Sequence, residues 1–206
     1  MSNTLLQKHW YDGWFYARFI DAENNPLRDR VLGFIEPGSA AIDLGCGSGG
    51  FTLKLAGHCR EVVGVDVSGK MIAAARKRLA KSGLGNVSFL HLHAGGLSEA
   101  LPRRFDYAVL SLMLHETPPA ERLQILGEAR RAAGRIVILD YQTPQPRSAW
   151  GAGVGIVEFL AGREHYRNFR DFVRRGGLPA LLQEAGLRII QEKINRTGVF
   201  RLVLAA

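Results

Sequence analysis

A glycine-rich segment between a short apolar run and a helix is the feature that most constrains the fold. It reads DLGCGSGG over residues 43–50, and Gly45, Gly47 and Gly50 satisfy the spacing G-x-G-x-x-G. Glycines in such a turn let the backbone approach a ligand closely and adopt dihedral angles barred to other residues. With an apolar strand before it and a helix after it, the segment predicts a strand–turn–helix unit that binds a nucleotide-like ligand.

The same alternation of strands and helices continues along the chain. Short apolar runs predict buried strands at 39–44, 61–65, 86–90, 105–111 and 135–140. Helices are expected at 51–56, after Ser68 as a cap, and after Pro118 with Leu123, Leu126 and Ala129 as an apolar stripe. Such alternation requires crossover connections and a mainly parallel sheet with both faces covered.

The C-terminal part predicts a different arrangement. Strands at 187–194 and 199–204 are joined by only four residues, which predicts an antiparallel hairpin at the edge of the sheet. The expected fold is therefore α/β: a Rossmann-like, doubly wound, mainly parallel seven-stranded sheet with an antiparallel C-terminal hairpin and helices on both faces.

We expect residues 1–206 to form a single domain, because no repeat or low-complexity linker divides the sequence. Residues 1–30 are rich in aromatic side chains and predict an N-terminal helical cap, in which Pro26 can open a helix. Residues 142–177 predict a lid-like insertion. Within it the glycine-containing apolar run 150–160 is expected to be flexible, and Asn168 is expected to cap a short helix.

Composition limits the setting and the partners. The chain shows neither a charged-then-apolar leader nor an apolar run of about 18 residues, so we expect a cytoplasmic protein. Its two cysteines, Cys46 and Cys59, are too few for a disulfide framework or a structural zinc site. The net charge of +8 admits nucleic acid or acidic lipid as a partner, but scattered basic residues on a solvated surface explain it equally.

Two acidic residues indicate the kind of ligand. A carboxylate at Asp43, aimed into the glycine turn, would repel phosphates and attract a cationic amine. Asp66 ends the next strand, 21 residues after Gly45, where a carboxylate can accept hydrogen bonds from both ribose hydroxyls. A ligand with an amine at one end and an adenosine at the other satisfies both acids, and S-adenosylmethionine is such a ligand. The alternative is that neither acid binds a ligand: Asp43 then only caps the turn, and Asp66 only ends its strand.

Several segments resemble motifs of the class I S-adenosylmethionine-dependent methyltransferases. They are 43–49, 65–68, 105–111 with His115-Glu116, and 130–141, together with the C-terminal hairpin. The resemblance covers about residues 26–206 and implies methyl transfer from S-adenosylmethionine as the cofactor. Residues 111–116 and 176–186 are also similar to the group that includes ubiquinone and menaquinone methyltransferases, which implies a small-molecule acceptor. The apolar run 150–160 is compatible with an apolar one.

The resemblance implies a role for each cofactor residue. Asp43 or a linked water would hold the methionine amine, Gly45 and Gly47 would face the methionine portion, and Asp66 would bind the ribose. Where the family usually has an Asp for the adenine amino group this chain has His93, and a backbone N–H near Ala94 could serve instead. The expected cofactor-binding residues are Tyr16, Asp43, Gly45, Cys46, Gly47, Asp66, Val67, Met71, His93, Ala94 and Ser111.

His115 is the residue expected to act as a general base if the acceptor atom carries a proton, because it follows the fourth strand near the ligand-binding edge. The alternative is a histidine that only shapes the turn. Tyr141, at the end of the fifth strand, is a second catalytic candidate. His91 and His93 share one face of an extended segment, but no nearby residue completes a ligand set, so no metal site is expected.

Other functions remain open at this point. The positive charge favours an RNA or protein methyltransferase, although residues 111–115 lack the Asn/Asp-Pro-Pro-aromatic motif of many amino-methylating enzymes. The glycine spacing also permits a nicotinamide-binding Rossmann protein, which Asp43 and the hairpin disfavour. The apolar run and the arginines at 163, 167, 170 and 174 fit either peripheral membrane contact or a packed helix with a solvated basic edge. The oligomeric state is not predicted.

Overall fold

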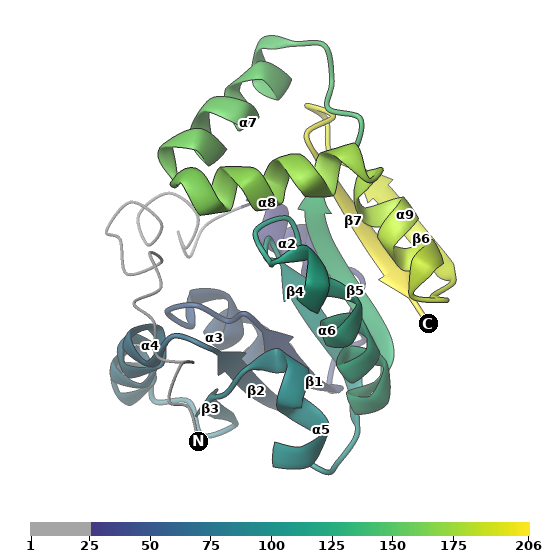
Figure 1. Ribbon diagram of the computed structural model, residues 1–206. Helices are drawn as coiled ribbons and strands as arrows, with labels where there is room; N and C mark the ends of the chain where they lie inside the picture. The colour runs from purple at the N-terminus through teal and green to yellow at the C-terminus, as the bar shows by residue number, and fades with distance from the viewer. Residues whose placement is uncertain (1–25) are drawn as a thin grey trace, which may run out of the picture.

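The computed structural model describes residues 26–206, which form a seven-stranded sheet in the order β3-β2-β1-β4-β5-β7-β6 (Figure 1). The first five strands pair in parallel, and β7 is antiparallel to both β5 and β6. The expected sheet and hairpin are thus confirmed. The strands are β1 (Ala40–Leu44), β2 (Glu61–Asp66), β3 (Val87–His91), β4 (Phe105–Ser111), β5 (Ala133–Tyr141), β6 (Ile189–Ile194) and β7 (Phe200–Ala205).

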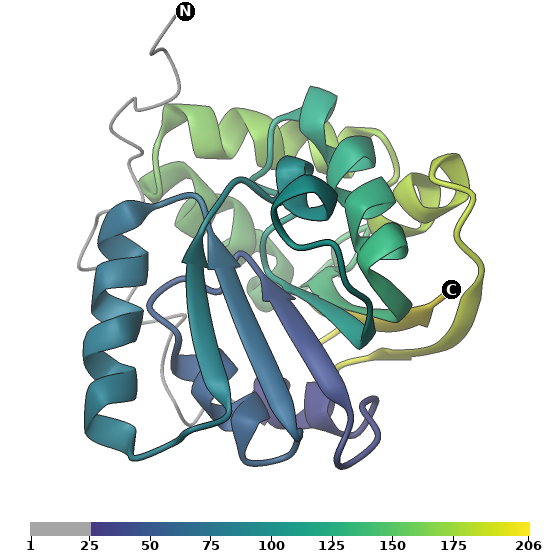
Figure 2. The same cartoon turned by 90° about the horizontal axis from the view of Figure 1, so that it is seen from below.

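Helices lie on both sides of the sheet, as Figure 2 shows from below. Residues of β4 alternate between the two apolar layers: Ala108 and Leu110 face one, Tyr107 and Val109 the other. This period of two, with both faces buried, is what a central parallel strand requires. The helices are α2 (Pro26–Leu32), α3 (Gly50–Ala56), α4 (Gly69–Ser82), α5 (Leu97–Ala100), α6 (Pro119–Ala132), α7 (Ala149–Leu160), α8 (Arg163–Arg174) and α9 (Gly177–Glu184), with a 3₁₀ turn η2 (Ala94–Gly96).

The segment between β5 and α9 differs from the sequence-based expectation. Residues 150–160, expected to be flexible, belong to helix α7, which begins where the Ser148 hydroxyl accepts a hydrogen bond from Gly151 N–H at 3.4 Å. Asn168, expected to cap a helix, lies inside α8, which is continuous. Its Nδ2 donates to the carbonyl of Glu116 at 2.8 Å. A contact with a distant loop thus explains a residue that locally reads as a cap.

Helix α8 runs across the carboxyl ends of β4 and β5, and α7 lies beyond α8 (Figure 1). A buried arginine of α6, Arg122, joins α8 to the loop that follows β4. Its Nε donates to the carbonyls of Leu114 and Thr117, both at 3.0 Å. Its Nη2 donates to the carbonyl of Asn168 at 2.7 Å, and its Nη1 pairs with Asp171 Oδ2 at 3.0 Å. Leu123, expected on the buried stripe of this helix, is instead 38% exposed, because Arg122 takes the inner face.

Replacing Arg122 by Met should lower the free energy of unfolding by about 3–5 kcal/mol, the usual cost of removing one partner of a buried charged network. The change removes a buried donor from three carbonyls and from Asp171, to which Arg174 and Arg175 still donate. Urea denaturation of the full chain measures the effect. The control is Arg167→Met, an exposed arginine of α8 paired only with the exposed Glu164, which should change stability by no more than about 0.5 kcal/mol. Equal losses in both variants would show that Arg122 does not anchor α8.

Candidate active site

The glycine turn at the carboxyl end of β1 is held by the two acids that the sequence analysis selected. Asp43 is 2% exposed, and its Oδ2 accepts a hydrogen bond from Thr52 Oγ1 at 2.7 Å, which ties the strand to α3. Asp66 Oδ2 accepts from Gly47 N–H and Oδ1 from Ser68 N–H, both at 2.8 Å. Asp66 thus bridges the glycine turn and the start of α4, and is only half-buried.

Two features of this edge fit a ligand with the shape of S-adenosylmethionine. Gly45 has a φ of +71°, and a Cβ there would lie 3.1 Å from Met113 Sδ, so only glycine leaves the turn open. The hydroxyl of Ser111, at the end of β4, is buried and makes no hydrogen bond within residues 26–206. An amino-acid moiety lying over the turn would use both the space and the hydroxyl.

The remaining predicted cofactor-binding residues differ in how exposed they are. Val67, after β2, is 37% exposed and Met71 is half-buried, so an adenine could contact both. Cys46 is buried, and that burial, followed by Asp43, raises the pKa of its thiol, which stays protonated. Ala94 begins η2 and is also buried. Tyr16, and with it most of the predicted N-terminal cap, lies outside the described residues.

His93 is engaged in local contacts. Its Nδ1 accepts from Gly95 N–H at 3.1 Å, which caps η2, and its Nε2 lies 2.9 Å from Glu121 Oε2. These two partners occupy both ring nitrogens.

His115 lies in the loop after β4, where a single carboxylate fixes its position. Asp140, fully buried on β5, accepts hydrogen bonds at Oδ2 from the N–H groups of Leu114 and His115, at 3.0 and 3.2 Å. Its Oδ1 lies 2.7 Å from His115 Nδ1. Leu112 enters this loop with a φ of +57°, a conformation that non-glycine residues rarely adopt and that functional sites often hold.

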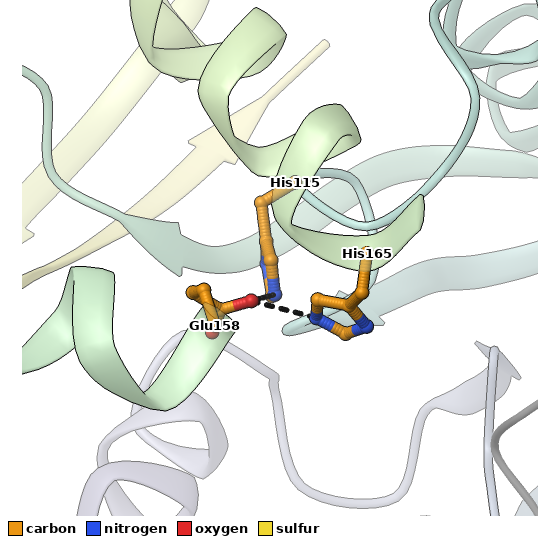
Figure 3. A group of neighbouring side chains, drawn as sticks. All are labelled: His115, Glu158 and His165. Carbon is orange, nitrogen blue, oxygen red and sulfur yellow. Dashed lines mark ion pairs between the residues drawn. The ribbon is translucent and has the colours of Figure 1, made fainter. Parts of the chain in front are cut away.

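Two further side chains reach His115 from α7 and α8 (Figure 3). Glu158 Oε2 lies 3.7 Å from His115 Nε2 and 2.6 Å from His165 Nε2. The hydroxyl of Tyr141 donates to Glu158 Oε1 at 2.7 Å. Glu116 Oε2 lies 3.5 Å from His165 Nδ1. Sheet edge and helices therefore share one buried polar cluster of histidines and carboxylates, which we call the His115 cluster: His115, Glu116, Asp140, Tyr141, Glu158 and His165.

The ionisable groups of the His115 cluster shift one another's pKa values. Burial alone would lower the pKa of His115, but Asp140, and then Glu158 and Glu116, raise it to about 9. Burial raises the pKa of Glu116 to about 8 although His115 opposes this. Burial also raises the pKa of Tyr141, with Glu158 adding to it, so the phenol keeps its proton. These carboxylates therefore favour the protonated imidazole of His115, which must lose its proton before Nε2 can accept one or bind a metal ion.

Sequence reasoning identified His115 and Tyr141 but assigned no role to Glu158 or His165. Glu158 lies in the run expected to be flexible, and His165 lies in a segment whose helical continuity was not recognised. A helical reading of 149–174 would have placed both residues near the turn that joins two helices. Their approach to His115 is a tertiary contact for which no local pattern exists.

A cavity of about 530 Å³ lies away from this cluster. Its lining includes Ser39, Arg60, Phe105, Asp106 and Arg135, near the amino ends of β1, β4 and β5. Ligands of open α/β sheets bind at the opposite, carboxyl ends. The glycine turn and the His115 cluster therefore define the candidate active site.

Comparison with known proteins identifies the family of the chain. A family model described as a methyltransferase domain matches residues 41–134. The ubiquinone biosynthesis O-methyltransferase of Pseudomonas aeruginosa is 30% identical over 173 residues, covering 80% of this chain and 72% of that protein. The demethylmenaquinone methyltransferase of Shouchella clausii is 34% identical over 119 residues, but these are 53% of this chain and about half, 48%, of that protein.

Solved structures share the fold at lower identity. A magnesium protoporphyrin IX methyltransferase from Synechocystis superimposes with a TM-score of 0.63 at 20% identity, covering 89% of this chain and 83% of that one. A methyltransferase from Aquifex aeolicus superimposes with a TM-score of 0.59 at 20% identity, covering 86% and 88%. The chain therefore belongs to the class I S-adenosylmethionine-dependent methyltransferases. S-adenosylmethionine is its methyl donor.

Replacing Asp66 by Ala should weaken binding of S-adenosylhomocysteine by about 1–3 kcal/mol, the cost of leaving the ribose hydroxyls without a charged partner. Calorimetric titration of the folded variant measures the change. Glu61→Ala, which removes an acid from the opposite end of β2, is the matched control and should bind normally. Unchanged affinity in Asp66→Ala would remove this residue from the cofactor site.

Proposed function

We propose that this chain transfers a methyl group from S-adenosylmethionine to a protic atom, such as a hydroxyl oxygen, of a small apolar molecule that binds beside His115. The observation that carries the proposal is the buried polar cluster next to the glycine turn. A methyl transfer site needs an acceptor-facing group there and a cover that excludes water. The His115 cluster supplies the first, and helices α7 and α8 supply the second.

Contacts between the two halves of the site support this arrangement. Met113, two residues before His115, lies against Gly45 of the cofactor turn. Asp66 is close enough to Glu116 to contribute to the raised pKa of that carboxyl. The donor and acceptor groups are thus adjacent at one edge of the sheet.

The outer surface of α7 supports an apolar acceptor. Its exposed apolar residues are Trp150, Ile156, Val157, Phe159 and Leu160, and Trp150 is 69% exposed. Arg163, Arg167, Arg170 and Arg174 follow on the continuous helix α8. Such a surface suits an acceptor that partitions into an anionic membrane surface, and we propose peripheral contact of that kind.

No helix among residues 26–206 is both long and apolar enough to cross a bilayer. The names of the relatives, which include quinone methyltransferases, agree with an apolar acceptor.

The hydrogen bonds of the site indicate the role of each residue. The sulfonium methyl of the donor is already activated, so the residues of the chain must orient the acceptor and manage its proton. His115 Nδ1 is engaged by Asp140, so Nε2 is the atom through which this ring acts on the acceptor. Tyr141 holds Glu158 through its hydroxyl and is a positioning residue.

His115→Ala should lower the rate of methyl transfer by about 10²–10⁴, with little change in affinity for S-adenosylhomocysteine, if the acceptor atom is protic. A panel of hydroxylated apolar aromatics, with formation of S-adenosylhomocysteine as readout, identifies the acceptor for this measurement. A near-normal rate at saturating acceptor would reduce His115 to a structural role. Methylation of RNA or protein in place of every small molecule would overturn the proposed acceptor class.

We further propose that residues 142–177 act as a lid that opens for exchange of acceptor and product. Hydrogen exchange should show increased amide protection across this segment when S-adenosylhomocysteine is added. The central strands β1 and β4 serve as the internal control and should be protected throughout. Equal protection of 142–177 with and without ligand would make the segment a fixed cover.

A further inference from the structure

Three buried side chains from three different elements bring one ligand atom each toward a common point (Figure 3). They are His115, Glu158 of α7 and His165 of α8, and each is at most 9% exposed. Glu158 Oε2 lies 3.7 Å from His115 Nε2 and 2.6 Å from His165 Nε2, and one ligand atom from each residue lies within 4.8 Å of the others. Ligands around a tetrahedral zinc ion are roughly 3.4 Å apart. The three residues are therefore gathered near the spacing of a ligand set.

The atoms that face away from this point have partners of the kind that metal ligands have. His115 Nδ1 is held by Asp140, and Tyr141 donates to Glu158 Oε1. His165 Nδ1 lies 3.5 Å from Glu116 Oε2. Metal-binding histidines usually direct their second ring nitrogen to a carboxylate or carbonyl, and metal-binding carboxylates are themselves hydrogen-bonded. His115 and Glu158 follow this pattern, and Glu116 is the carboxylate close to the second nitrogen of His165.

The atoms that face the point are poorly satisfied without a cation. Glu158 Oε2 is buried and makes no well-aligned hydrogen bond to any described residue, despite its closeness to His165. A buried carboxylate oxygen without a donor is costly. A divalent cation at the common point would satisfy this oxygen of Glu158.

We propose that His115, Glu158 and His165 bind one divalent transition-metal ion. Two imidazoles and one carboxylate, with at least one position left for another ligand, form a donor set typical of zinc or ferrous iron. Magnesium and calcium prefer all-oxygen sites. The ion would act as a Lewis acid toward an acceptor oxygen in the remaining position, so that His115 Nε2 acts through the ion. Binding of the ion itself does not depend on the proposed acceptor.

The test uses the full-length chain, stripped of metal by a chelator and shown to be folded by circular dichroism. Calorimetric titration with Zn²⁺ should give one site per chain with micromolar or tighter affinity. Co²⁺ should give the visible absorption of a four- or five-coordinate site. Glu116→Gln, which alters an outer partner, should weaken zinc binding by about 10–100-fold. Glu158→Gln and His165→Ala, which remove ligands, should weaken it more.

His93→Ala is the matched control, since it removes an exposed histidine that also pairs with a carboxylate, Glu121, and it should bind zinc like the unaltered chain. Absence of a one-to-one site in the unaltered chain, or equal affinity in Glu158→Gln and His165→Ala, would overturn the proposal. The cobalt spectrum of the unaltered chain gives a result even if a variant does not fold. The titrations contain neither donor nor acceptor, so their failure leaves the proposed methyl transfer standing, and failure of methyl transfer leaves the metal site standing.

Discussion

The buried carboxylate of Asp140 is the group on which the geometry of the site depends. It accepts hydrogen bonds from the backbone of Leu114, His115 and Tyr141 and holds the ring of His115. Leu114 and His115 belong to the loop after β4, and Tyr141 ends β5. The side chain of Asp140 therefore holds the loop after β4 against the end of β5. The unfavourable φ of Leu112 is tolerated because this loop is held so firmly.

Arg122 complements Asp140 from the other direction. It donates to carbonyls of the same loop and to α8, so the loop lies between a buried anion and a buried cation. Both groups use several directional hydrogen bonds to backbone atoms, which fix positions better than an ion pair between side chains alone. The position of α8 is therefore fixed relative to the sheet edge by Arg122, which also bonds to the loop that carries His115.

Much of the architecture could be predicted because it depends on local signals. The glycine turn, the cap at Ser68 and the alternation of buried strands gave the elements nearly to the residue, and the short link before Val199 required an antiparallel hairpin. The interior of 142–177 was not predictable in the same way. Glycines in an apolar run indicate flexibility, whereas packing against the sheet edge stabilises α7, and Asn168 is explained only by its bond to the loop at Glu116.

The same distinction separates the two halves of the site. Asp43 and Asp66 lie in the last two residues of β1 and β2, so their place at the carboxyl edge comes from chain order alone. The His115 cluster requires that residues 115, 140, 158 and 165 meet, and no spacing in the sequence encodes this meeting. Arg122 shows why periodicity misleads here: its charge reads as a solvated position, yet it takes the buried face and leaves Leu123 exposed.

The groups of the His115 cluster differ in what holds them in place. Asp140 bonds to three backbone N–H groups and cannot move without unfolding the loop. Glu158 and His165 instead lie on α7 and α8, the helices that cover the edge. A movement of α7 and α8 would therefore withdraw Glu158 and His165 from His115 while leaving the His115–Asp140 pair intact. Opening of the proposed lid would thus disperse the polar cluster, and access to the proposed acceptor site would be coupled to the charge that surrounds His115.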